Sequence, residues 1–304
     1  MSILDRVLGH PGLAALGRWS TRSRLRVLAM HEVRDIDRLD HQLNELLRWF
    51  HPVDASQVVR SFRDGVPLGD NAVWVTFDDG DHSTIVDAAA LLEQHGVRAT
   101  AFVCPAFVEA LSAPWWDVVS SAVDSGHPVT IDGHQHRDPA VVTLMKSLPD
   151  EVRRSIVDQL PPPSGSNARS QVTIEDLRRW RSLGGEIGNH TWDHPCLDQC
   201  APGEQITQID RAAGWLDDHA MWDHRLFAYP NGDRTDVAEQ HLRDAGYDLV
   251  ALFDHRLTAR HPQAHRVSRL RLTAGASPQR TRAVTSGLHS GLFGARDRVF
   301  NRQG

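Results

Sequence analysis

Two adjacent aspartates stand where a strand-like run ends. Asp78 and Asp79 directly follow VWVTF (73–77), and a glycine comes after them. An acidic pair in this position is often only turn chemistry, because aspartate favours turns and helix caps. In parallel α/β folds, however, ligands bind at the carboxyl ends of the strands. The pair is therefore a candidate for general-base or metal-ligand chemistry.

Two histidines, His190 and His194 in GNHTWDHP, follow a second strand-like run. Pro195 disfavours helix at the residue before it, so we expect a loop after the strand. One Asp with two His ligands leaves a coordination position open for water, as a catalytic zinc site requires. The spacing alone is a weak signal in a sequence with 18 histidines. The aspartate pair makes a metal site the stronger hypothesis.

The cysteines allow a rival metal site. His194, Cys196 and Cys200 could hold structural zinc, but their spacing matches no common pattern and no fourth ligand is evident. The total of three cysteines is also odd, which argues against a disulfide framework. Ordinary reduced cysteines are the simpler interpretation.

Short β-rich runs alternate with helical patterns and would position these residues. The expected strands are 25–31, 73–77, 99–103, 185–190, 226–230, 249–253 and 265–272. The expected helices are 38–50, 84–95, 173–183, 203–218, 235–245 and 277–290. Such alternation predicts parallel pairing in an α/β fold. We expect a distorted or incomplete (β/α) barrel of about seven parallel strands. His31, Pro230 and Asn231 also fall at strand ends of this arrangement.

One segment breaks the alternation. Residues 112–171, which contain PWW and PPPSGSNARS, are expected to form a lid-like insertion at the rim. We expect residues 1–24 to be an N-terminal extension, residues 25–290 to be the main domain, and residues 291–304 to be a tail.

Bulk properties exclude some partners. The net charge is −6 and charged residues form no long run, so nothing indicates nucleic-acid binding. Lys146 is the only lysine, which excludes a P-loop lysine elsewhere. No apolar stretch reaches the length of a membrane span or a secretory core. A cytoplasmic location is the simplest expectation.

Three motifs together resemble a known family. TFDDG (76–80), HTWDH (190–194) and FAYPNG (227–232) are similar to those of the polysaccharide deacetylases, the NodB-homology group or carbohydrate esterase family four. The resemblance extends over roughly residues 25 to 272 and implies a distorted barrel. It also implies a hydrolase that deacetylates a carbohydrate: an N-acetylated sugar, an oligosaccharide, or a lipid- or nucleotide-linked glycan precursor.

The resemblance assigns roles to individual residues. Asp79, His190 and His194 would bind a divalent metal, with zinc as the first choice and cobalt or nickel as alternatives. A metal-activated water would attack the acetamide carbonyl, with Asp78 as the general base. The backbone N–H of Asn231 would stabilise the oxyanion.

The sequence departs from the family pattern at the general acid. The usual late motif has no clean copy, although His255, His261 and His265 lie in that region. LAMHEV (28–33) resembles the early histidine of circularly permuted members, so we favour His31.

A second departure concerns the arginine that orients the base aspartate in many members. Ala228 stands at its position, and Arg269 and Arg266 are the candidates to replace it. We favour Arg269.

The sequence leaves two alternative functions open. Asp79-Gly80-Asp81 imitates the nucleophile motif of haloacid-dehalogenase-type phosphohydrolases, but Ser83 stands where that class needs Thr or Val, and the two histidines have no role in it. The other alternative is a non-catalytic glycan-binding relative that keeps the fold. Trp115 and Trp116 in the insertion are candidates for stacking on sugar rings.

Overall fold

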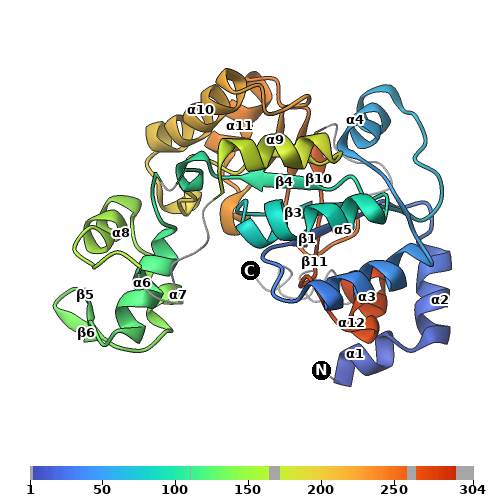
Figure 1. Ribbon diagram of the computed structural model, residues 1–304, viewed down its shortest axis with the longest axis horizontal. Helices are drawn as coiled ribbons and strands as arrows, with labels where there is room; N and C mark the ends of the chain where they lie inside the picture. Colours follow the sequence, from blue (N-terminus) through green and yellow to red (C-terminus); the bar gives the residue numbers. More distant parts are fainter. Residues whose placement is uncertain (1–2, 110, 164–171, 259–264, 292–304) are drawn as a thin grey trace, which may run out of the picture.

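A computed structural model describes residues 3–109, 111–163, 172–258 and 265–291. Its centre is a sheet in which the order of strands is β10-β9-β8-β7-β4-β3-β1-β11 (Figure 1). All neighbours along this order pair in parallel. The strands are β1 (Arg26–Met30), β3 (Ala72–Phe77), β4 (Thr100–Val103), β7 (Glu186–Asn189), β8 (Leu226–Ala228), β9 (Leu249–Ala251), β10 (Arg266–Val267) and β11 (Leu270–Arg271).

The last expected strand, 265–272, is two short strands instead of one. β10 pairs with β9, while β11, three residues later, pairs with β1 at the other edge of the sheet. Between them, Asp254 accepts hydrogen bonds from the Ser268 hydroxyl at 2.7 Å and from the Arg269 N–H at 3.2 Å. The segment therefore bridges the two edges, and the expected incomplete barrel is confirmed.

Strand side chains alternate between two apolar clusters, as the two-residue period of a strand requires. Val27, Trp74 and Phe102 belong to the cluster inside the barrel. Leu28 and Val75 belong to the larger cluster between the strands and the helices. The strand core is buried on both faces, which explains why its sequence reads as continuous apolar runs.

Helices surround the sheet. They are α1 (Ile3–Leu8), α2 (Pro11–Ser20), α3 (Ile36–Leu47), α4 (Ala55–Asp64), α5 (Ala89–Gln94), α9 (Ile174–Ser182), α10 (Pro202–Asp218), α11 (Asp236–Asp244) and α12 (Pro278–Thr285). The expected helix 84–95 begins as a π-helix, η1 (Ser83–Asp87), before α5. A capping box between Thr173 and Asp176 begins α9.

Some elements were not expected from the sequence. Pro11 is the first residue of α2, where proline is well tolerated because no backbone N–H is needed there. α1 and α2 both pack against α12. The short strand β2 (His51–Pro52) pairs with β3.

The insertion forms a lobe beside the barrel (Figure 1). It contains α6 (Trp115–Asp124), the hairpin β5 (Val129–Ile131) and β6 (His134–His136), α7 (Val141–Met145) and α8 (Asp150–Val157). A small apolar cluster of its own holds it together. A bridge between Val108 and Val172 joins the two ends of the segment at the barrel.

None of the helices in the described ranges combines the length and the apolar character that a membrane span needs.

Candidate metal centre

Asp79, His190 and His194 come together at the carboxyl ends of β3 and β7. Asp79 Oδ1 lies 3.5 Å from His190 Nε2 and 3.4 Å from His194 Nε2. Ligand atoms about 2.0–2.1 Å from a shared tetrahedral ion would be separated by about 3.3 Å, so the observed spacing suits such an ion. Within the described part of the chain, these three residues are the only group with this ligand geometry.

Burial and nearby charges set the protonation of Asp79 and His194 to the forms that bind a metal. Burial raises the pKa of Asp79, but the contact with His190 and the charge of His194 outweigh it and hold this pKa well below its usual range. Burial lowers the pKa of His194 to about 3. At neutral pH the site therefore offers a carboxylate and a neutral imidazole. Asp79 Oδ1 is buried and has no hydrogen-bond partner, which costs free energy unless a cation pairs with it. The residues present thus fit a divalent metal.

Partners behind the ligands set their orientation. His190 Nδ1 lies 2.8 Å from the carbonyl oxygen of Ala228. Because a carbonyl can only accept, this nitrogen carries the proton and Nε2 is left to bind a metal. Trp115 Nε1 donates to the carbonyl of His194 at 3.2 Å, and the Trp116 ring lies 4.6 Å from the His194 ring.

The backbone at the site is strained. Asp79, Thr191 and His194 have φ angles of 73°, 68° and 59°, in the left-handed region that most residues avoid. Thr191 Oγ1 accepts a hydrogen bond from the N–H of His194 at 3.2 Å, so this residue shapes the loop, as expected. Gly80, at φ 70°, continues the turn after Asp79, and a side chain here would press on Val103.

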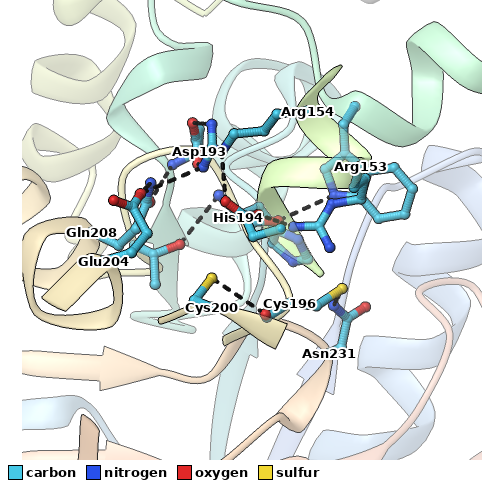
Figure 2. Close-up of polar contacts among 12 residues, drawn as sticks. Arg153, Arg154, Asp193, His194, Cys196, Cys200, Glu204, Gln208 and Asn231 are labelled. Carbon is cyan, nitrogen blue, oxygen red and sulfur yellow. Dashed lines mark hydrogen bonds and ion pairs between the residues drawn. The ribbon is translucent and has the colours of Figure 1, made fainter. Parts of the chain in front are cut away.

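An ion pair from the insertion holds the loop that carries His194. Arg154 on α8 makes two hydrogen bonds with Asp193, at 2.6 and 3.0 Å (Figure 2). On the opposite side, Gln208 accepts hydrogen bonds from the backbone N–H groups of Trp192 and Asp193. The insertion is thus part of the support of a candidate metal ligand. Sequence reasoning missed Arg154, because nothing in the insertion marked which residue reaches the barrel.

We expect Arg154→Met to weaken zinc binding by about tenfold, because support residues behind metal ligands typically contribute this much. A titration against a fluorescent zinc chelator measures the dissociation constant. Arg178→Met on α9 is the matched control, since among the described residues the ion-pair partner of Arg178 is the exposed Glu175. Equal zinc affinities for the two variants would contradict a role of Arg154 in the site.

Asp78 points to a different partner. Its carboxylate receives two hydrogen bonds from Arg269, at 2.6 and 2.9 Å, and both side chains are almost fully buried. Burial raises the pKa of Asp78, but the positive charge of Arg269 outweighs it and keeps this pKa below its ordinary value. Of the two arginines considered, Arg269 is therefore the one that contacts Asp78. Arg266 instead binds Glu239.

His31 is exposed at the end of β1, with its ring 5.7 Å from the Phe253 ring. Two residues that follow the aspartates fix its loop: Thr84 donates to the carbonyl of His31, and Ser83 accepts from the N–H of Val33. The N–H of Asp78 donates to the carbonyl of Met30 at 2.9 Å, so His31 and Asp78 follow the ends of two paired strands.

The alternative histidines are engaged elsewhere. His255 is buried, accepts from the N–H of Arg271 and contacts His289 at 2.6 Å. Burial lowers the pKa of His255 to about 4. His265 binds Glu239 at 2.6 Å. His261 lies outside the described residues.

Asn231, in η5 (Pro230–Gly232) after β8, also reaches this end of the barrel. Its φ is 54°, and its side-chain oxygen accepts a hydrogen bond from Lys146 Nζ at 2.6 Å. Lys146 caps α7 in the insertion, so a second residue of the lobe touches the site.

The rival structural-zinc site is not formed. Cys196 and Cys200 are buried and free, and Cys200 Sγ donates to the carbonyl of Cys196 (Figure 2). Burial raises their thiol pKa values to about 11 and about 12, so neither is a thiolate at neutral pH. Trp115 is only 8% exposed and is part of the core of the lobe, so it cannot stack on a sugar.

Comparison with known proteins bears on the family and the fold. Residues 65–159 and 164–250 match the family model for polysaccharide deacetylase. IcaB from Ammonifex degensii has a TM-score of 0.60 at 21% identity, over 87% of this chain and 97% of that one. The Streptococcus pyogenes deacetylase PplD, solved in complex with acetate, has a TM-score of 0.59 at 17% identity, over 86% and 97%. The BpsB deacetylase domain from Bordetella bronchiseptica has a TM-score of 0.57 at 14% identity, over 83% and 96%. At these identities the structures establish a shared fold.

Proposed function

The chain belongs to the polysaccharide deacetylase family, and from that premise we propose that it is a metal-dependent hydrolase that removes acetyl groups from an N-acetylated sugar or glycan precursor. The observation that carries the proposal is the buried Asp79 Oδ1, which has no hydrogen-bond partner and faces two imidazole nitrogens. No specific observation favours the phosphohydrolase alternative.

Asp79, His190 and His194 would hold the metal. Their mixed carboxylate and imidazole set suits zinc first, and cobalt or nickel as well. When bound, the ion would polarise the acetamide carbonyl and lower the pKa of water in the site.

The other polar side chains would move and hold protons. Asp78, kept ionised by Arg269, would take the proton from the attacking water. His31 is exposed at the end of the strand that pairs with the one before Asp78, and it would give a proton to the departing amine. The backbone N–H of Asn231 would stabilise the developing oxyanion. A cytoplasmic location stays a prediction from the sequence.

The test is acetate release. Protein loaded with zinc, cobalt or nickel should release acetate from at least one member of a panel of chitooligosaccharides, small N-acetylated sugar conjugates and O-acetylated sugars. Asp78→Asn should lower the rate by about 10²–10⁴-fold, the usual contribution of a general base, while it keeps the metal.

If metal-loaded protein binds these sugars and releases no acetate, the non-catalytic alternative replaces the enzyme. Release of phosphate from sugar phosphates would instead support the phosphohydrolase.

A further inference from the structure

A cavity lies next to His31, which forms part of its lining. Its volume is about 490 Å³, enough for a monosaccharide-sized group, and it opens between the ends of β1 and β11 and the N-terminal part of α12. His31 and Phe253 form part of its wall, together with Glu32 and three arginines, Arg34, Arg271 and Arg280.

The charges in this cavity do not balance. Arg34 is paired with Glu32, at 2.7 Å, and Arg280 with Asp5, also at 2.7 Å. Among the described residues, no carboxylate forms an ion pair with Arg271. The cavity therefore carries an excess positive charge, and that charge lies on Arg271.

Contacts with Phe253 fix the orientation of the Arg271 side chain. Its Nε donates to the carbonyl of Phe253 at 2.9 Å, and its Nη2 donates to the same carbonyl. Its guanidinium lies 4.3 Å from the centre of the Phe253 ring. Carbonyl contacts and ring packing hold the group without neutralising it. The remaining N–H groups of an oriented guanidinium suit a planar or tetrahedral oxyanion.

We propose that this cavity binds an oxyanion of the substrate, which is a phosphate or a carboxylate group. The sugar from which the protein removes the acetyl group would then carry a negative charge. This inference rests on the proposed function, because His31 joins the cavity to the aspartates. A sugar whose acetamide lies at Asp78 and Asp79 would pass His31 and place a charged substituent against Arg271.

The test compares charged and neutral substrates in Arg271→Gln. N-acetylglucosamine 1-phosphate tests the phosphate, N-acetylmuramic acid tests the carboxylate, and N-acetylglucosamine is the neutral reference. We expect the variant to lower kcat/KM at least tenfold for one charged substrate, mainly through KM, and less than twofold for the neutral one. Arg271→Lys should show a smaller loss. Arg48→Gln, at the C-cap of α3, also removes one exposed positive charge and should leave kcat/KM for all three substrates unchanged.

A binding measurement separates this inference from the proposed function. Inorganic phosphate and pyrophosphate are titrated calorimetrically into the full-length protein and into Arg271→Gln, which have the same metal centre. We expect at least fivefold weaker binding by the variant, and this result would support the cavity even if no acetate were released from any sugar. Equal anion binding by the two proteins, or an equal loss of kcat/KM on charged and neutral substrates, would overturn the inference.

Discussion

Asp79→Asn is expected to empty the metal centre and to lower acetate release by about a thousandfold. The amide keeps the size of the side chain, and asparagine tolerates the left-handed backbone at this position. What is lost is the negative charge that faces His190 and His194. Charge stabilisation by a catalytic metal amounts to several kcal/mol, which corresponds to about 10³ in rate.

Elemental analysis and an acetate assay on the same sample check this expectation. Asp81→Asn is the control, because Asp81 lies in the same loop but hydrogen-bonds to Ser83 rather than facing the histidines. It should bind the metal at the wild-type ratio. If Asp79→Asn retained as much metal as this control, Asp79 would not be a ligand.

Much of this centre could be predicted because Asp78, Asp79 and His190 come within two residues of a strand end. Asp78, Asp79 and His190 are fixed in direction by strands whose apolar runs are plain in the sequence. Parallel strands then bring their carboxyl ends to one side of the barrel. A local pattern thus predicted residues more than a hundred positions apart to be neighbours.

The parts that were missed depend on long-range contacts or on local signals that were overlooked. Nothing near Arg154 or Lys146 indicates that they reach Asp193 and Asn231, because the path of the insertion decides this. α4, in contrast, had a readable signal. Asp54 and Gln57 form a capping box at its start, and this pattern marks a helix N-terminus.

Arg269 was one of two candidate partners for Asp78. It contacts Asp78 because it lies where the chain crosses from one edge of the sheet to the other. β10 pairs with β9 and β11 with β1, so Ser268 and Arg269 between them are released from regular strand pairing. The N–H of Arg269 binds Asp254, and its side chain enters the barrel, over the Phe102 ring. The split strand, which the sequence did not indicate, is thus what positions the arginine of the site.

Arg269→Met is expected to destabilise the protein by about 3–5 kcal/mol at neutral pH, because it leaves the buried Asp78 carboxylate without its counter-charge. In the wild type the pKa of Asp78 is lowered, so its ion pair contributes stability at neutral pH and loses it as pH falls through that pKa. In the variant, Asp78 is still buried but has lost the positive charge of Arg269, so burial raises its pKa. The stability of Arg269→Met should therefore increase as pH falls from 7 towards 5, and urea unfolding at several pH values measures this.

The same change should alter the pH dependence of catalysis. A general base acts only when ionised, so kcat/KM falls as pH drops through the pKa of Asp78. We expect Arg269→Met to move this acidic limb to higher pH. The double variant Arg269→Met/Asp78→Asn separates folding from chemistry, because it removes both buried charges together. It should recover most of the lost stability and stay inactive. A double variant as unstable as Arg269→Met would show that Arg269 stabilises the barrel by packing, independently of Asp78.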